Sequence, residues 1–427
     1  QGHRVTFKQP NINSVALNRV VGEASSQILG SLKANGRVFL VNPNGVVFGK
    51  DASVDVGSLV ASTLDITDEN FLADIYQFQG LARGINNSGN IKAADGGAIV
   101  LLGGVVENSG TVIAKRGKVV LAAGTKVVLG FGKDNRLEVA VDESTLNAEV
   151  SNHGSLIADG GDVWMAARTA DGLLQTVINN TGHIQARTME KRRGIIRLWG
   201  GGSGGSMQIW GSLDVSAELG DAGGISIRGR HVQVDAGTQV ELSAPRGNGG
   251  LLQVSATKGD LSVVNADSAW PFSRIDASVL NAALKQGHVH LNSDKGDIRV
   301  DAPVNWQQNR LQLNAQRNID VNRVMTASGT AALELNHGGH DAVTGAPATR
   351  AHSGVNMAMS DDGFTGRVDF EDVLDQSAKS NRRLTINGES YALLTKVASH
   401  PLHASGRGDA ATNSAAQPLQ NIKDLKG

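Results

Sequence analysis

Histidines and carboxylates toward the C-terminus are the residue types most suited to holding a metal ion. His337, His340 and His352 stand near the acidic segment DDGFTGRVDFED. The HGGH pair has i, i+3 spacing, but the sequence has no Cys, no H-E-x-x-H frame and no GGxGxDx calcium repeat. We therefore expect no metal site and no other cofactor.

A glycine-rich segment, LWGGGSGGSMQIW at residues 198–210, could be compared with a phosphate-binding loop. It lacks the Gly-Lys-Ser/Thr ending of such loops, and no helical pattern follows it. We therefore predict a flexible loop between coils. The preceding basic patch, Lys191, Arg192 and Arg193, has a composition that favours a solvated loop over a glycan or phosphate site.

The tetrapeptide Asn42, Pro43, Asn44, Gly45 lies between two runs of β-branched residues. Pro43 fixes φ for the second position of a turn, the Asn42 side chain can accept from the backbone two residues on, and Gly45 suits the fourth position. The residues therefore predict a tight turn that docks an N-terminal cap onto the first coils.

A second short motif could act in recognition. Arg407, Gly408 and Asp409 form the Arg-Gly-Asp tripeptide of integrin ligands, within a small and polar segment. Three residues occur often by chance, so a solvated linker is favoured over a cell-attachment site.

A repeated seven-residue pattern indicates the elements that must position these residues. Asn-x-Gly-x-apolar-x-Ala begins at Asn87, Asn108, Asn152 and Asn180, with successive spacings of 21, 44 and 28 along the chain. We interpret the spacing of 21 as one turn of a coil, that of 44 as two turns of 22, and that of 28 as one turn with a small insertion.

Further repeats extend the pattern. Related segments begin at Gly211 and Gly237, a spacing of 26, and GDIRV and RNIDV begin at a spacing of 21. Segments such as AIVLL, GISIRG and HVQVD alternate with the period of two typical of β-strands. Units of this length are too short for βαβ crossovers and lack a helical period, so they predict an all-β, right-handed parallel β-helix with a rise of about 4.8 Å per coil. An antiparallel sandwich would require the matching spacings to be coincidental.

In such a helix Val and Ile point inward, and Asn and Gly occupy the corners. We interpret Asn87, Asn108, Asn152 and Asn180 as a structural ladder whose side chains bond along a column, and not as a ligand array. We expect the glycine of each corner to take a positive φ.

Two regions interrupt the rhythm. Residues 1–35 are apolar but irregular and suit a cap, because the end coil of a solenoid exposes unpaired backbone groups. Residues 339–427 resemble long loops around a few further coils. We expect one domain over 1–330, with an N-terminal β cap over about 1–60, coils over about 60–330 and some extra-helical loops or hairpins, followed by coils and loops over 331–427.

Composition narrows the class of protein. The 427 residues have a net charge of −1, which argues against a nucleic-acid partner, and only 4% aromatic residues, which suits a narrow aliphatic core. No apolar run approaches the length of a membrane span, and the absence of Cys is compatible with an oxidising compartment. QGHRVTFKQP lacks signal-peptide regions and LQNIKDLKG lacks a cap signal, so we expect a processed N-terminus and a longer parent protein.

The segment SQILGSLKANGRVFLVNPNGVVFGKDASVDVGSLVAST closely resembles the N-terminal secretion domain of two-partner-secretion exoproteins. These are the filamentous-haemagglutinin-like and high-molecular-weight adhesins of Gram-negative bacteria. NPNG is that family's signature tetrapeptide, and the later LLGGVVENSGTVIA and GKVVLAAG are typical of it. The resemblance is strong over residues 1–190 and extends to about 330, and LTINGESYALL resembles the segment that leads into an adhesin fibre. A second family motif, Asn-Pro-Asn-Leu, does not occur in this chain.

The resemblance implies a route of secretion and a set of partners. Such domains cross the inner membrane unfolded, bind the periplasmic POTRA domains of a TpsB-type outer-membrane β-barrel, and fold at the cell surface. It implies that Asn42–Gly45 is the transporter-recognition motif of a non-enzymatic, monomeric secretion signal and folding nucleus. It also implies that downstream regions contact a host-cell protein or glycan, without membrane insertion.

Two other functions remain open at this point. The same secretion domain could carry a cytolysin, a growth-inhibition toxin or a haem-acquisition protein, which residues beyond 427 would decide. Less favoured is a β-helix polysaccharide lyase or hydrolase, because its site needs carboxylates or basic residues at one register on successive coils. The registers of 21 and 22 align small and aliphatic residues instead.

Overall fold

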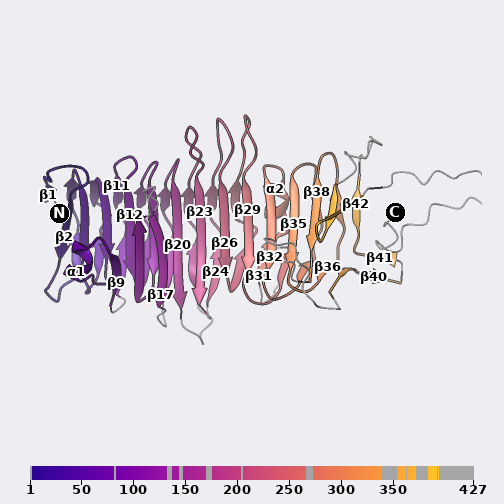
Figure 1. The fold of residues 1–427 in the computed structure, drawn as a ribbon, viewed down its shortest axis with the longest axis horizontal. Coiled ribbons are helices and arrows are strands. Elements are labelled where there is room, and N and C mark those ends of the chain that lie inside the picture. The colour runs from indigo at the N-terminus through magenta and orange to yellow at the C-terminus, as the bar shows by residue number, and fades with distance from the viewer. Residues whose placement is uncertain are drawn as a thin grey trace, which may run out of the picture.

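The computed structural model describes residues 2–80, 83–131, 137–143, 148–169, 176–202, 205–265, 273–338, 353–361, 363–371, 383–391 and 393. Within these residues most strands belong to three long sheets of 9, 13 and 14 strands. Successive strands of the chain mostly pass from sheet to sheet, and most of them pair in parallel with their equivalents in the next coil, although β30 and β31 lie side by side in one sheet. The stack of coils runs along the long axis of the molecule (Figure 1). The predicted parallel β-helix is therefore confirmed.

In stacking order, the 9-stranded sheet contains β1 (Arg4–Phe7), β4 (Ser31–Ala34), β7 (Ser53–Val56), β11 (Asn90–Ala93), β14 (Thr111–Ile113), β19 (Ser155–Ile157), β22 (His183–Gln185), β25 (Ser212–Asp214) and β28 (Gln239–Glu241). The 13-stranded sheet contains β3 (Ser26–Ile28), β6 (Val46–Phe48), β10 (Gly84–Asn87), β13 (Val105–Asn108), β18 (Glu149–Asn152), β21 (Thr176–Asn180), β24 (Ser206–Ile209), β27 (His231–Val234), β31 (Ser273–Asp276), β30 (Leu261–Val264), β33 (Ile298–Val300), β36 (Ile319–Val321) and β39 (Val355–Met357). The 14-stranded sheet contains β2 (Val15–Arg19), β5 (Arg37–Val41), β8 (Ser58–Ser62), β12 (Ala98–Gly103), β15 (Lys118–Ala123), β20 (Asp162–Thr169), β23 (Ile195–Gly202), β26 (Gly224–Gly229), β29 (Leu251–Ala256), β32 (His288–Ser293), β35 (Arg310–Ala315), β38 (Ala332–Asn336), β43 (Leu384–Ile386) and the antiparallel β44 (Glu389–Tyr391).

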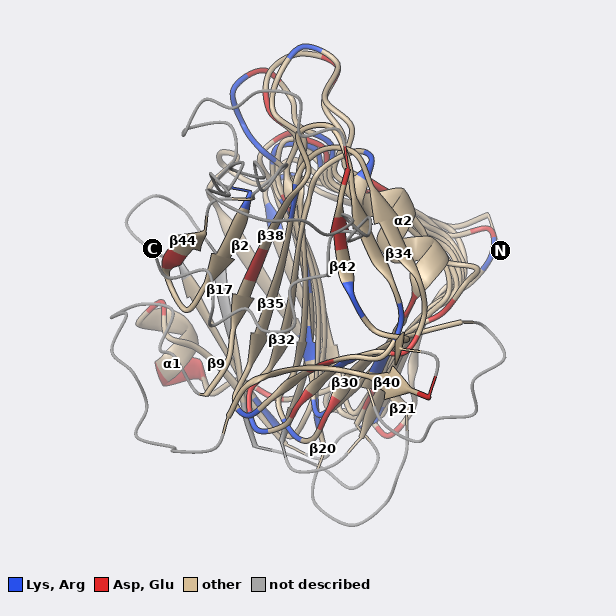
Figure 2. Cartoon of the chain, turned by 90° about the vertical axis from the view of Figure 1, so that its right-hand side faces the viewer, with Lys and Arg blue, Asp and Glu red and all other residues tan. Residues whose placement is uncertain are grey.

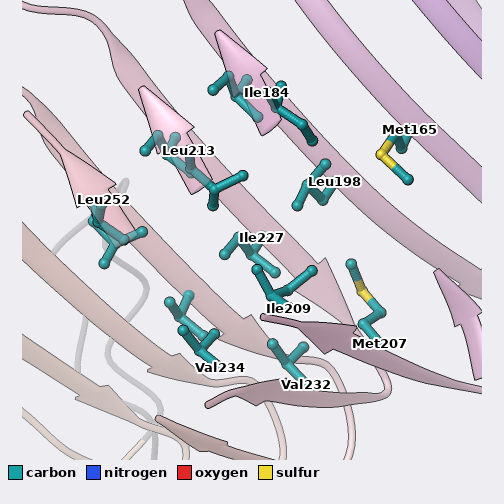
Figure 3. Packing of buried hydrophobic residues seen from close by; sticks show 14 of the residues in the cluster. Met165, Ile184, Leu198, Met207, Ile209, Leu213, Ile227, Val232, Val234 and Leu252 are labelled. Atoms are coloured by element: carbon teal, nitrogen blue, oxygen red, sulfur yellow. The ribbon is translucent and has the colours of Figure 1, made fainter. Parts of the chain in front are cut away.

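The core inside the coils consists of stacked aliphatic columns. Leu198 and Ile227 pair in neighbouring strands of the 14-stranded sheet, and Ile184 pairs with Leu213 in the 9-stranded sheet. These side chains point toward one another across the interior (Figure 3). The alternating sequence produces this arrangement because every second side chain of a strand faces inward.

A second apolar layer lies outside the coils. β9 (Tyr76–Gln79), β16 (Lys126–Phe131) and β17 (Leu137–Glu143) form an antiparallel sheet that lies beside the 14-stranded sheet with α1 (Asp68–Leu72), as Figure 2 shows. Phe39 on the outer face of β5 packs against the rings of Tyr76 and Phe78. Strands β12 and β15 are therefore buried on both faces, which explains their nearly continuous apolar runs AIVLL and VVLAA.

The interpretation of the spacing of 44 as two turns is wrong. Asn108 of β13 pairs directly with Asn152 of β18, so these residues belong to neighbouring coils. The additional residues include the antiparallel β16–β17 pair, which leaves the helix instead of forming a coil. The spacing of 26 between Gly211 and Gly237 is also one residue too short, because Ser212 pairs with Gln239, 27 residues later.

The N-terminal residues follow the path of a coil. β1, β2 and β3 lie in parallel register on β4, β5 and β6, so the N-terminal β cap is a complete layer of strands stacked on the next coil. Its side chains are less buried than those of later coils, and Val5 is 53% exposed.

A short helix interrupts the strand stack and was not expected from the sequence. α2 (Ala277–Leu284) follows β31, and its N-cap Asp276 accepts a hydrogen bond from the Ser278 amide. α2 contacts β28 of the 9-stranded sheet and β34 (Val304–Trp306), and so occupies one level of that column. β34, β37 (Met325–Ala327) and β42 (Val368–Phe370) continue the column, and β40 (Met359–Ser360) pairs with β41 (Gly363–Phe364). Neither helix in the described ranges is long and apolar enough to cross a membrane.

Candidate functional site

The tetrapeptide Asn42–Gly45 connects β5 of the 14-stranded sheet to β6 of the 13-stranded sheet. The Gly45 amide donates to the Asn42 carbonyl at 3.1 Å, and the Asn44 amide donates to Asn42 Oδ1 at 2.9 Å. Gly45 has a φ of 116°, which an L side chain rarely adopts. The chain therefore forms a tight turn closed by both the main chain and the first asparagine.

The Asn42 side chain joins this turn to the first coil. It is fully buried, and its Nδ2 donates to the Ala24 carbonyl at 3.0 Å and to Ser26 Oγ at 2.9 Å. Asn44 Nδ2 donates to the Gly22 carbonyl at 2.7 Å. Gly22 and Ala24 precede β3 and Ser26 begins it, and these partners follow no sequence period, so no pattern in the sequence predicts them.

The turn is also bonded to the coil on its other side. The Asn42 amide donates to the Ser62 carbonyl at 2.9 Å, and the Ser26 amide donates to the Gly45 carbonyl at 3.0 Å. The tetrapeptide therefore holds three consecutive coils together. Asn42 and Gly45 are buried, Pro43 is half-buried, and Asn44 is exposed.

The corner asparagines form a hydrogen-bonded column further along the stack. Asn87 Nδ2 donates to Asn108 Oδ1 at 2.7 Å, Asn108 Nδ2 donates to Asn152 Oδ1 at 2.8 Å, and Asn152 Nδ2 donates to Asn180 Oδ1 at 2.7 Å. All four side chains are fully buried. A buried column of this kind has its polar groups satisfied internally and presents nothing to a ligand.

The expected positive φ at the corner glycines is wrong. Gly89, Gly110, Gly154 and Gly182 do not adopt it, and glycine is required there for another reason. A Cβ on Gly110 would lie 2.1 Å from the Gly89 carbonyl oxygen, and one on Gly154 would lie 2.1 Å from the Gly110 carbonyl oxygen. The corners stack so closely that only hydrogen fits between them.

The remaining motifs have separate outcomes. The glycine-rich segment expected to be a loop is largely strand, because residues up to Gly202 extend β23 and β24 begins at Ser206. A Cβ on Gly201 would lie 2.4 Å from the Trp199 ring, which explains that glycine, and one on Gly200 would lie 3.1 Å from the Met207 side chain, a tight contact. His337 lies next to Ser353 and Asn387, whereas His340, His352 and the Arg407–Asp409 tripeptide lie outside the described residues. Within the described part of the chain no three His, Asp or Glu side chains gather as a metal site.

Comparison with known families decides what the N-terminal half is. The family model for the TPS secretion domain matches residues 1–209, a range that contains the Asn42–Gly45 turn and the asparagine column. Residues 1–209 belong to the TPS secretion domain family. This family of two-partner-secretion exoproteins is the one that the NPNG segment resembles.

Sequence relatives and a solved structure agree with the family. Two proteins of Haemophilus influenzae named Heme/hemopexin-binding protein, one of them from strain KW20/Rd, are similar to this chain, at 33% identity over 51% of it and 30% identity over 46% of it. The chain spans about a quarter of those relatives, since each match covers 24% of their length. The crystal structure of the HMW1 secretion domain from Haemophilus influenzae superposes with a TM-score of 0.58 at 23% identity, over 90% of this chain and 88% of that one, which shows the same fold.

Family membership establishes the route of export in general terms. A TPS secretion domain is exported by a two-partner system of Gram-negative cells and is paired with an outer-membrane transporter of the TpsB type. The domain is a secretion module.

Proposed function

We propose that the TPS domain of this chain is the segment that the POTRA domains of its transporter recognise, and the nucleus on which a large surface adhesin folds. The observation that carries the proposal is the Asn42–Gly45 turn, whose side chains and main chain hold the first three coils together. Recognition and nucleation would then use the same residues at different times.

The burial of Asn42 sets the order of these two events. In the folded chain the side-chain amide of Asn42 donates to Ala24 and Ser26 and is inaccessible to a partner. Before folding, the same amide is free to bond to a POTRA surface. Folding therefore buries the residue that the transporter recognises, and this burial favours release of the chain once the first coils have formed.

The coil architecture supports folding that proceeds outward from the transporter. Most strands of the three long sheets pair with the equivalent strands of the coils before and after them, as Ile85 pairs with Val46 and Val106. A newly emerged coil therefore closes a short loop onto a completed one, at a small entropic cost. The first coil is the natural starting point because the later coils stack upon it.

An adhesin that contacts a host-cell protein or glycan through downstream regions is the payload that we favour, and we propose no enzymatic activity. The second candidate is a haem-acquisition protein, favoured by the names of the two Haemophilus relatives. The chain covers about a quarter of those relatives, so their names support a payload of this kind without locating a haem site.

The test is co-expression of the chain, with a cleavable signal peptide, beside its genomically adjacent TpsB-type transporter. The proposal expects the chain in the culture medium when the transporter is present, and in the periplasm when it is absent. A chain that stays in the periplasm beside an active transporter would contradict it.

A further inference from the structure

A basic cleft runs along the outer face of the 14-stranded sheet, where its strands begin. It has a volume of about 1070 Å³. Arg37, the first residue of β5, lies toward one end, and Ile195 and Arg197 of β23 lie toward the other. Six successive strands lie between and including β5 and β23, so at about 4.8 Å per strand the cleft is roughly 24 Å long. It is separate from the secretion turn, because Arg37 begins the strand that Asn42 follows.

The charges of the cleft are strongly unequal. Of the described residues that line it, seven are Lys or Arg and one, Asp162, is acidic. Arg37 lies on the β5 level, Lys118 on the β15 level and Arg197 on the β23 level. Cations therefore recur along the length of the cleft.

Carboxylates just outside the lining offset part of this charge. Arg116 pairs with Asp95 at 3.4 Å and with Glu190 at 3.0 Å, and Arg193 pairs with Asp221. The cations still outnumber these carboxylates and Asp162 together. The lining as a whole stays cationic.

An aromatic side chain lies among these cations. The Arg197 guanidinium is 4.8 Å and the Lys118 ammonium 5.5 Å from the centroid of the Trp164 ring. Both cations also face Asp162, at 3.7 and 3.5 Å. Cation–π contact and ion pairing hold the two long side chains in place, which lowers the entropy lost when they bind an anion.

One wall is formed by the turns before β12, β15 and β20, where five glycines stand beside Arg116. Gly96, Gly97, Gly117, Gly160 and Gly161 line it. Gly96 has open space where a side chain would stand, so a bulky ring can approach the main chain there. Lys191, Arg192 and Arg193 extend from the loop before β23, and all three are exposed.

The floor of the cleft excludes the commonest way of binding a peptide. An extended peptide gains affinity by adding to a free sheet edge, but β8, β12, β15 and β20 are inner strands paired on both sides. Recognition here must come from side chains, and guanidinium forks match carboxylate and sulfate oxygens in pairs. A linear ligand with anions at repeating intervals and ring-shaped units fits these features.

We propose that this cleft binds an anionic polysaccharide that carries carboxylate or sulfate groups along its length. The chain lies parallel to the helix axis, with its anions on the Arg and Lys side chains of successive levels. Its rings lie against the glycine wall and the edge of Trp164.

The test is calorimetric titration of the 427-residue chain with heparin-derived oligosaccharides of increasing length, and with polygalacturonate as a carboxylate-only probe. Affinity is expected to rise with oligosaccharide length until the cleft is filled, and then to level off. The triple variant K191S/R192S/R193S is expected to bind at least about tenfold more weakly, and to lower the slope of log K against log salt by about two to three.

A matched control separates a cleft from general charge attraction. K33S/K50S/K92S removes the same charge from exposed residues outside the cleft, and should leave binding within about twofold. Equal losses in the two triple variants would overturn the proposal, and so would equal binding of polyglutamate at matched charge, which would indicate a peptide site. Should the cleft variant fail to fold, the single variant K191S, with an expected loss of about threefold, carries the test.

Discussion

Replacing Asn42 with Ala isolates the contribution of the turn to the first coils. The substitution removes two hydrogen bonds donated to Ala24 and Ser26 and one accepted from the Asn44 amide. The backbone can keep its path, because the Gly45 amide still donates to the Asn42 carbonyl. The loss should therefore fall on the attachment of residues 22–26 and spare the distant coils.

The magnitude follows from the burial of the side chain. A hydrogen bond contributes about 1 kcal/mol net, and a buried polar group left without a partner costs about 1–3 kcal/mol. Asn42→Ala should therefore lower the free energy of opening the first coil by about 2–4 kcal/mol. Asn44→Ala removes one hydrogen bond of an exposed side chain and should cost about 0.5–1 kcal/mol.

Native-state hydrogen exchange measures both values at individual strands. Amides of β2 and β3 should exchange faster in Asn42→Ala than in Asn44→Ala, while amides of β29 and β32 keep wild-type protection. Equal effects of the two variants on the first coil, or a loss spread evenly over all coils, would refute the assignment of the turn as the attachment point.

Two further predictions concern packing and pH. Gly117→Ala would place a Cβ 1.7 Å from the Gly97 carbonyl oxygen and should lower the free energy of unfolding by about 3 kcal/mol or more. Gly96→Ala, at a φ of 80° with open space around it, should lower it by about 1–2 kcal/mol. Denaturant unfolding measures both values, and similar values would contradict the close stacking of corners. Burial lowers the pKa of His288 and His290, so below about 6.5 the unfolded state binds more protons than the folded one, and the free energy of unfolding should fall as pH drops from about 6.5 to the folded pKa. Unfolding of a His288→Gln/His290→Gln variant, measured across pH 5–8, should show a smaller slope, with a remainder from His231, whose pKa burial also lowers, and an unchanged slope would assign it to other groups.

The coil architecture was predictable because its repeating unit carries its own register. Asn87 and Asn108 are one repeat apart in the sequence and stand opposite each other in the sheet. The interval of 44 residues from Asn108 to Asn152 was misinterpreted as two coils, because KVVLGF and LEVAVDE alternate as coil strands do. These two strands pair with each other outside the helix. Period-two alternation indicates a strand and a buried face, but not the sheet to which the strand belongs.

The site was predictable only in part. The local geometry of the turn follows from Pro43 and from the Asn42 side chain, which accepts from the Asn44 amide as expected. Its attachment to Gly22, Ala24 and Ser26 depends on stacking of the first coil, for which the sequence carries no repeat. Similarly, the cations of the cleft are scattered from residue 37 to residue 197 and meet only because equivalent levels align.

The reason for each glycine was also beyond the sequence. A glycine required by a positive φ and one required by close approach look identical in the sequence. Gly45 belongs to the first kind and Gly110 to the second. Only the position of the neighbouring coil distinguishes them.

The measurement that tests the central claim most directly compares two buried asparagines in secretion. Asn42→Ala and Asn108→Ala each remove three side-chain hydrogen bonds of a fully buried residue, so their costs in stability should be similar. Each is co-expressed with the transporter, and the fraction of chain in the medium is measured. If the transporter reads the turn, Asn42→Ala should reduce this fraction about tenfold, equivalent to about 1.4 kcal/mol of lost recognition, while Asn108→Ala stays within about twofold of wild type. Equal reductions would show that secretion follows stability alone and would contradict recognition of Asn42–Gly45.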